Sequence, residues 1–523
     1  MALSSVSFIE GKSGLGRPLL SNDHISGIAY YNVSSYPSGF ASTSISTRCK
    51  LLYSVDDAVA AGIKIDYSDA TAATATYLVT NKGLDQETLE LKVADLNPAT
   101  GLARTTSLGV YTNAGTPAST TTCATAIAAF INAGTNTHGY SATSSTATVT
   151  IIAPKAQGAF LNNGTPLTAT YSAGATLAGT ITQFGVIPGV ASKLAQYYYH
   201  VREFFRMQPK GLLWVGFFGS PSTYSEITDM QTYAGANGGS MRQVGIWKDG
   251  TWASGDITYL QAVGVACKAI YQPLSIVYAA NLFATTDITT VSDVSTLTAN
   301  LVSSCIGQDG SGLGNFIYMT SGSATKISIT DLGTVIGAIA KRKVSESIAW
   351  VRDTNLSDGT EHEIANFCNG QAVTALSTSA LTALDTKGHI FLLKYPGGYA
   401  GTYYNSSRTC ITYTSDYATI ELNRTICKAE RNLYAKYVPY LSSPIAFNAD
   451  GTLTDLTIAE WETEGNAGLD QMVKDSELSA KSVVINPTQN TLSTSTLTVA
   501  VTLVPMGVAR FIVINIGYKT SIV

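Results

Sequence analysis

The chain has 523 residues, which is enough for roughly two to four domains and a large buried core. Charged residues make up only 13% of it, against about 25% in an average soluble protein, and Ser, Thr, Ala and Gly fill the difference. Its 32 basic and 36 acidic residues give a net charge of −4 without a basic cluster, which argues against nucleic-acid binding.

The first 20 residues are predicted to form an extended arm. Val6 and Phe8 alternate with polar neighbours, and Gly and Pro residues between positions 11 and 18 interrupt any regular element. The segment has few apolar groups of its own, so it is stable only when docked on another surface. The alternative interpretation is a frayed chain end.

The core is predicted to begin with strands at 25 to 31 and 45 to 53. A short helix follows them. Ser54 caps its start and Gly62 ends it.

Residues 66 to 185 are rich in Ala and Thr and are predicted to form a small β-rich domain inserted into a larger one. A helix is expected at 121 to 134, because Ile127 and Ile131 are four residues apart. A half-buried strand is expected within 140 to 155, because apolar residues alternate there with polar ones. Asn162, Asn163 and Gly164 are typical of a tight hairpin.

From about residue 190 apolar runs of strand length alternate with helical spacing, which predicts an α/β sheet of largely parallel strands flanked by helices. The expected strands are 211–218, 242–247, 274–281 and 315–320. The expected helices are 222–235, 256–270, 291–304 and 330–342.

The C-terminal region opens with a strand near 388, in which His389 is expected to be packed. A helix is predicted over 417 to 438, capped by Asp416 and stopped by Pro439. Its apolar residues form one stripe: Ala418, Leu422, Ile426, Ala429, Leu433 and Tyr437. Its other face carries a basic line, formed by Arg424, Lys428 and Arg431. An acidic segment follows, and then strands at 496–504 and 508–518 joined by a turn at 504–507.

Neither export nor membrane insertion is expected. The first residues contain no basic leader and no apolar core, so we predict no signal peptide. The longest apolar runs, such as 211 to 219, are about half the ~20 residues that a membrane helix needs. Seven scattered Cys residues without a CxxC pair favour a reducing cytosol over disulfides or a zinc site. A crosslink between copies is the alternative.

The sequence offers no convincing catalytic, metal or cofactor site. Gly11-Lys12-Ser13 lacks the earlier glycine of a phosphate-binding loop, and the glycine-rich residues 310 to 314 fit a surface turn better than a nucleotide site. Glu361, His362 and Glu363 with Cys368 are interpreted as a solvated cluster rather than a metal site. The acidic residues between 455 and 477 fit a solvated or partner-facing helix better than a glycosidase pair.

Several motifs stand in a characteristic order near the C-terminus. They are TSDYATIELNRTICKAERNLYAKYVPYL, NADGTLT, QMVKDSELSAKSVVINPTQN and VTLVPMGVARFIVINIGY, preceded by GHIFLLKYPGGYAGTYYN. This ordered set resembles the C-terminal region of contractile phage tail sheath proteins, the tail sheath family of contractile injection systems. The α/β rhythm extends the resemblance to about residue 190. The first 65 residues match loosely and the insert hardly at all.

The resemblance implies an α/β and α+β multidomain fold: a sheath-like core with a mixed sheet flanked by helices, an inserted β-rich domain, and extended arms at both ends. It divides the chain into a linking arm (1–20), the first part of the core (21–65), an outer inserted domain (66–185), an α/β sheath domain (186–387), an inner C-terminal domain (388–518) and a C-terminal arm (519–523).

The implied function is structural and not enzymatic. Copies would polymerise in stacked rings around an inner tube and contract, driving the tube through the target cell envelope during genome or effector delivery. The implied partners are further copies, the inner tail tube protein, and the baseplate and tail terminator proteins, with no nucleic acid, membrane anchor or cofactor. The implied location is the virion tail, after assembly in the bacterial host cytoplasm. A surface poor in charge suits a subunit covered by partners.

Neighbours in this family are linked by arms that add strands to each other's sheets, and an apolar extended segment is suited to that contact. The residues expected to add strands are Val6, Phe8, Phe511, Val513 and Ile514. The alternative is that 508 to 518 is an internal strand. Two sets compete as the tube contact, the basic line and the acidic residues Glu460, Glu462 and Glu464, and an ordinary wet helix face is the alternative for both.

Two rival functions stay open from the sequence. The first is another structural protein, such as a non-contractile virion protein, an adhesin or a surface-layer subunit whose insert binds glycans. The second is a hydrolase that uses the acidic segment. Secreted β-rich proteins share this composition, but the missing export signal argues against the first rival.

Overall fold

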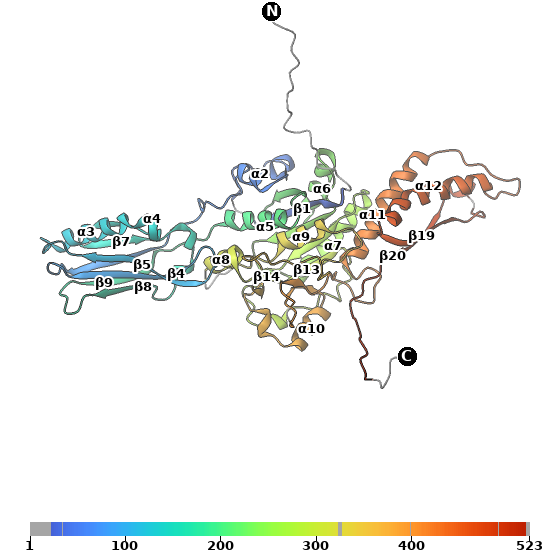
Figure 1. Ribbon diagram of the computed structural model, residues 1–523. Coiled ribbons are helices and arrows are strands. Elements are labelled where there is room, and N and C mark those ends of the chain that lie inside the picture. The colour runs from blue at the N-terminus through green and yellow to red at the C-terminus, as the bar shows by residue number, and fades with distance from the viewer. Residues whose placement is uncertain (1–21, 34, 323–326, 398, 490, 519–523) are drawn as a thin grey trace, which may run out of the picture.

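The structure is a computed structural model, which describes residues 22–33, 35–322, 327–397, 399–489 and 491–518. Figure 1 shows an elongated arrangement of three parts. A β-rich lobe lies at one end, an α/β body lies in the middle, and a smaller lobe of two long helices and a short sheet lies at the other end. This is the mixed α/β class, with an inserted β-rich domain, that the sequence predicts.

The body is built on a seven-stranded sheet in the order β16-β13-β12-β11-β1-β10-β2. Neighbouring strands are parallel except β10 and β2, which are antiparallel, so the sheet is mixed. The strands are β1 (Ile25–Tyr31), β2 (Cys49–Leu52), β10 (Leu212–Phe217), β11 (Gln243–Lys248), β12 (Ser275–Ala279), β13 (Val302–Cys305) and β16 (His389–Ile390). The central strands are buried on both faces, which explains why they are continuous apolar runs in the sequence.

Helices cover this sheet. They include α2 (Val55–Ala60), α5 (Lys193–Met207), α6 (Glu226–Asn237), α7 (Ser254–Ala269) and α9 (Leu332–Lys341). Ser54 caps α2 as expected, because its side chain accepts a hydrogen bond from the backbone N–H of Asp57. Helices α5 and α9 approach closely, since a Cβ added at Gly337 would lie 2.7 Å from Cβ of Met207.

The inserted lobe has a hydrophobic core of its own, formed by residues between Ala73 and Phe184. Its two sheets have the orders β6-β7-β3-β9 and β5-β4-β8. Its elements are β3 (Thr74–Asn81), β4 (Thr88–Leu96), β5 (Ala103–Thr112), α3 (Thr120–Ala133), α4 (Thr135–His138), β6 (Ser141–Ser145), β7 (Thr148–Ile152), β8 (Leu167–Tyr171) and β9 (Ala178–Ile187). The chain enters and leaves at one point, where Thr71 and Val190 form an antiparallel bridge.

The rest of the body consists of short elements. They are α8 (Gly312–Thr320), α10 (Thr378–Thr386), and two small antiparallel pairs: β14 (Gly307–Asp309) with β15 (Ala365–Phe367), and β17 (Leu392–Leu393) with β18 (Tyr403–Tyr404). His389 is fully buried, as predicted, and one of its ring nitrogens lies 3.1 Å from Oγ of Ser304.

The C-terminal lobe contains α11 (Ile420–Tyr437), α12 (Asp455–Lys474), β19 (Leu478–Ile485), α13 (Thr491–Thr494) and β20 (Val499–Pro505). Helix α12 packs against α11 and against the two-stranded sheet β19–β20. The small core between them contains Ala429, Leu469, Met472, Leu478 and Val483. Among the described helices, none combines the length and the apolar character that a membrane span requires.

Several expected elements differ from the structure. Residues 315 to 320 lie in α8 and not in a strand, because a helix buried on most sides has the same apolar run as a buried strand. No residue of 291 to 304 is helical, since Asp293 binds the backbone N–H of Ser295 and so competes with helix formation.

Three further expectations are wrong in their local structure. Residues 45 to 48 form the short helix α1, because Ser44 and Thr47 cap each other's backbone. Asn162 ends a 3-10 helix and the segment 162–164 joins no hairpin, because β7 and β8 belong to different sheets. Helix α11 begins at Ile420 after Thr419, so Asp416 does not cap it.

Candidate functional site

The segment that follows β20 is apolar and strongly exposed. Residues 506 to 518 form no strand, and the exposed fractions of Phe511, Val513 and Ile514 are 79%, 84% and 74%. In the single chain, residues 508–518 therefore form neither the predicted strand nor the internal strand of the alternative interpretation. From here on the name C-terminal arm refers to residues 506 to 518, which precede the arm that the sequence predicts at 519–523. Large exposed apolar side chains in a row mark a surface that a partner covers.

The two-stranded sheet beside this arm has open edges. Strands β19 and β20 are antiparallel, with Val483 opposite Val501, and in the described residues no third strand pairs with either. One face packs on the helices through Val483 and Ile485, while Val484 and Val504 on the other are about half exposed. A two-stranded sheet is stable only with such packing, and unpaired backbone groups along its edges are ready to bond another strand.

The basic line on α11 is not an exposed face. Arg424 is 4% exposed, and its guanidinium donates to the backbone carbonyl oxygens of Arg342 and Lys343. Nζ of Lys428 lies 2.8 Å from Asp23 and 2.7 Å from Glu477. Arg431 also binds Asp23. The predicted tube contact through these three side chains is therefore not supported by their placement, because partners within the chain occupy them.

The apolar stripe that the sequence predicts on α11 is only partly buried. Leu422 and Ile426 are half-buried, whereas the polar residues Glu421, Asn423 and Thr425 are buried. This helix lies between the body and α12, so it contacts neighbours on several sides. Its polar side chains meet backbone groups there, as when Thr425 donates to the carbonyl oxygen of Val344.

The acidic candidates on α12 differ in their surroundings. Glu462 accepts a hydrogen bond from the backbone N–H of Ile485 at 2.8 Å, so it fixes the end of β19. Glu464 lies 3.4 Å from Nζ of Lys436 on α11. Glu460 is exposed. Of the six residues predicted to meet a tube, Glu460 is thus the one whose side chain is most available. Val6 and Phe8 lie outside the described residues.

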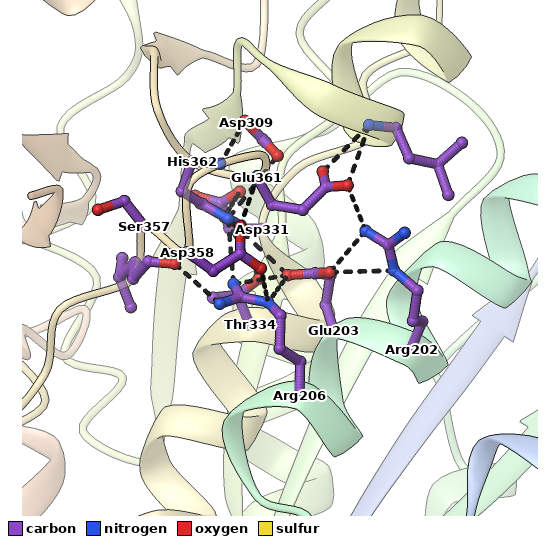
Figure 2. Close-up of polar contacts among 12 residues, drawn as sticks. Arg202, Glu203, Arg206, Asp309, Asp331, Thr334, Ser357, Asp358, Glu361 and His362 are labelled. Atoms are coloured by element: carbon purple, nitrogen blue, oxygen red, sulfur yellow. Dashed lines mark hydrogen bonds and ion pairs between the residues drawn. The ribbon is translucent and has the colours of Figure 1, made fainter. Parts of the chain in front are cut away.

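A second group of charged residues lies inside the body (Figure 2). Its members are Arg202, Glu203, Arg206, Asp309, Asp331, Asp358, Glu361 and His362. His362 and Glu203 are fully buried, and Glu361 is 4% exposed, so the predicted solvated cluster around Glu361 and His362 is wrong. The adjacent side chains of Glu361 and His362 are both covered by other parts of the protein. Among the described residues, no set of His, Cys, Asp or Glu is placed to hold a metal ion.

His362 is the centre of this ionic cluster. Its Nε2 lies 3.1 Å from Asp331, and its Nδ1 lies 3.7 Å from Asp309 and 3.8 Å from Glu203. Burial lowers the pKa of His362, but these carboxylates outweigh burial and raise the pKa to about 9. Burial raises the pKa of Asp309 to about 7. The raised pKa favours a charged His362, which joins the loop before β15 to α5, β14 and α9, and Nη2 of Arg206 lies 3.2 Å from its Nδ1.

The glycine-rich residues 310 to 314 open α8 beside this cluster. They are mostly buried, so the predicted surface turn is wrong. The backbone N–H of Leu313, at the start of the helix, donates to the carboxylate of Glu361 at 3.1 Å. A carboxylate of the chain itself thus occupies the place that an anion takes at a helix N-terminus.

Sequence reasoning missed most members of the ionic cluster. Arg202, Glu203 and Arg206 stand in the run YYYHVREFFRM, where charged residues share a helix with buried aromatic ones. Charges within such an apolar helix are the signal of a buried ion-pair network, because unpaired buried charges are costly. Asp309 and Asp331 carry no comparable signal.

The chain matches the two models of one protein family: "DUF2586, N-terminal domain" over residues 92–408 and "DUF2586, C-terminal domain" over residues 416–522. It belongs to the DUF2586 family. The two matched segments of this DUF2586 protein meet just before α11, where the body gives way to the C-terminal lobe. None of the curated proteins matches the chain.

Two solved structures are similar to this DUF2586 protein. One is from "Cryo-EM structure of the anti-feeding prophage (AFP) baseplate, 6-fold symmetrised", with a TM-score of 0.43 and 13% identity, covering 65% of this chain and 85% of that one. The other is from the AFP helical sheath in contracted state, with a TM-score of 0.43 and 13% identity, covering 61% of this chain and 81% of that one. The second is a sheath, the kind of protein that the sequence resembles, but a likeness of this size does not by itself carry a role over.

Proposed function

We propose that this DUF2586 protein is a structural, non-enzymatic subunit of a contractile tail sheath. Copies polymerise as stacked rings around an inner tube, and a change in their packing drives the tube through a target cell envelope. The ordered C-terminal motifs support the proposal from the sequence. The observation that carries it is the exposed apolar C-terminal arm, next to a two-stranded sheet with open edges.

The C-terminal arm supplies the additional strand that an open sheet edge lacks. An added strand gains main-chain hydrogen bonds, each worth about 0.5–1.5 kcal/mol net, so a strand with about five bonds contributes several kcal/mol before its ordering entropy is subtracted. Phe511, Val513 and Ile514 are fully available for such pairing in the single chain. The partner is a second copy, because every copy presents both the arm and the open edges. Links of this kind hold neighbours together while rigid bodies rotate.

Val6 and Phe8 are assigned the same role at the other end of the chain. For the tube contact we retain the acidic side of α12 around Glu460, since the basic line of α11 is engaged within the chain. Polar contacts suit a contact between sheath and tube that must dissociate, because exposed ion pairs contribute only ~0–1 kcal/mol each. Baseplate and terminator proteins complete the proposed set of partners, and the virion tail is the proposed location.

Electron microscopy of the purified full-length protein tests this function. We expect hollow, striated cylinders of fixed diameter, in a long narrow form and a short wide form. A chain lacking residues 511–523 and a chain lacking residues 1–16 should each stay folded by circular dichroism but form no cylinders. Persistent monomers of the full-length chain under all assembly conditions, or normal cylinders from both deletions, would contradict the proposal.

A further inference from the structure

The base of the C-terminal arm is held on the body by one arginine. Arg510 lies five residues beyond the end of β20, yet its Nη2 lies 2.7 Å from both carboxylate oxygens of Asp385 in the last turn of α10. Its guanidinium also stacks over the ring of Tyr413, 5.2 Å from the centroid, and Arg408 stacks on the same ring at 4.8 Å. We name Arg510, Asp385 and Tyr413 the arm clamp. Figure 1 shows the arm leaving the C-terminal lobe and running past the region of α10.

The position of Asp385 makes it a strong partner for an arginine. A carboxylate in the last turn of a helix faces the negative end of the helix dipole, so a cation beside it is favoured. Asp385 also accepts a hydrogen bond from Nδ2 of Asn405 at 2.8 Å, which fixes its orientation. The side chains of Arg510 and Asp385 are 24% and 27% exposed, so water screens this pair only in part.

The clamp is incompatible with a hairpin that the sequence otherwise favours. Residues 499–505 and 508–518 are both rich in β-branched and apolar residues, and the short turn between them would bring the arm back along the open edge of β20. In that hairpin, with Met506 and Gly507 as its loop, Arg510 would stand opposite Leu503 of β20. It lies at α10 instead, so the two arrangements exclude each other.

We propose that the arm clamp keeps the C-terminal arm from pairing with its own β20. The arm is thereby directed away from its own sheet, and the edge of β20 stays open for a strand of another copy. A tethered strand has a high effective concentration next to its own sheet, so without the clamp self-pairing would compete with pairing between copies. The consequence for assembly rests on the proposed function, whereas the clamp itself is a property of the single chain.

Hydrogen exchange on the monomeric full-length protein tests the clamp directly. Backbone amides of residues 511–516 should exchange rapidly in the natural chain. In Arg510→Gln and in Asp385→Asn these amides should slow by about tenfold or more, as expected when a strand becomes paired. Lys436→Gln is the matched control: it also removes one cation from a surface ion pair in this region, with Glu464, and it should leave the exchange of the arm unchanged.

The same variants separate this inference from the proposed function. If neither Arg510→Gln nor Asp385→Asn slows exchange in the arm while circular dichroism shows both folded, the clamp proposal is overturned. That result would leave the sheath proposal intact, which depends on whether the chain lacking 511–523 still polymerises. Slower exchange together with slower cylinder formation, in both clamp variants and not in Lys436→Gln, supports both.

Discussion

Arg431, on α11, binds Asp23, a residue 408 positions earlier in the chain, with its Nη2 2.9 Å from Oδ1. Lys428 of the same helix binds the other oxygen of this carboxylate at 2.8 Å. Burial alone would raise the pKa of Asp23, but Lys428, Arg431 and Arg424 outweigh burial and hold the pKa below its ordinary value. These ion pairs therefore fix the segment just before β1 to α11.

We expect Asp23→Asn to weaken this junction strongly. Removing one partner of a buried ionic group leaves the other charges uncompensated, which costs about 3 kcal/mol of unfolding free energy. Chemical denaturation of the monomer measures this loss. Asp66→Asn is the control, because Asp66 pairs with Lys64 at the surface and its loss should change the midpoint little. Equal effects from both variants would contradict the role assigned to Asp23.

The lowered pKa of Asp23 predicts that the stability of the protein depends on pH in the acidic range. A carboxylate whose pKa is lowered on folding contributes stability that is present above its unfolded value of 3.8 and is lost as the pH falls through the folded pKa. The natural chain should therefore lose stability on acidification below about pH 4, and Asp23→Asn should lose less over that interval. Thermal melting between pH 5 and pH 2.5 checks this difference.

His362 predicts the opposite trend at alkaline pH. Its pKa rises from 6.5 to about 9 on folding, so its contribution is complete below pH 6.5 and is lost as the pH rises through 9. The shift corresponds to about 3 kcal/mol. We expect the melting temperature of the natural chain to fall between pH 6.5 and 9.5, and His362→Gln to show a lower but flatter profile there.

Asp309 contributes to the same pH profile in two ways. Its pKa is raised from 3.8 to about 7, so the part of the pH dependence that it causes lies below pH 7. Asp309→Asn should therefore flatten the profile between pH 4 and 7, and it should also reduce the fall above pH 7, because the Asp309 carboxylate contributes most to the raised pKa of His362. A natural chain whose melting temperature is constant from pH 6.5 to 9.5 would rule out a charged His362.

The close approach of α5 and α9 predicts a large effect from one methyl group. A Cβ at Gly333 would overlap the carbonyl oxygen of His200, a backbone atom that cannot move alone. Gly333→Ala should cost about 1–3 kcal/mol or more of unfolding free energy. Gly255→Ala is the matched control, since nothing lies within 4 Å of its added Cβ in α7 and it should stabilise by about 0.5 kcal/mol. Equal melting temperatures for the two variants would contradict this packing.

The bridge between Thr71 and Val190 predicts that the inserted lobe is separable. The two backbone hydrogen bonds of this bridge are 3.1 and 3.0 Å long, so the body needs no spacer to close the gap. A chain in which a short Gly-Ser linker replaces residues 72–189 should fold with its body intact, and the lobe should fold alone around its own core. Circular dichroism and thermal melting of both pieces check this. Unfolding of the shortened chain would show that the body depends on the lobe.

Sequence pattern predicted the centre of the fold well. The strands β1, β10, β11 and β12 and the helices α6, α7 and α9 lie where their apolar runs and spacings place them, because each buries its pattern against the same sheet. Patterns failed where local and tertiary effects compete. The run at 315–320 is apolar all round because α8 is enclosed, and that pattern does not distinguish a strand from a helix.

Pairing between distant residues was the hardest feature to predict. The helix α11 shows a basic line in its sequence, but nothing in that line reveals that Asp23 lies opposite it. The same holds for Arg510, whose partner Asp385 lies 125 positions away and turns an expected hairpin strand into a free arm. The apolar character of the arm was predictable, whereas its direction depends on one ion pair.

All seven cysteines of the chain are free and buried. Burial raises the pKa of several of these thiols, that of Cys49 to about 12, which keeps them protonated and slow to react. In the proposed assembly, these buried thiols are therefore not placed to form disulfide bonds between the surfaces of two copies. The links between copies in that assembly would then be noncovalent, so that a change of shape is able to break and re-form them in oxidising as well as in reducing surroundings.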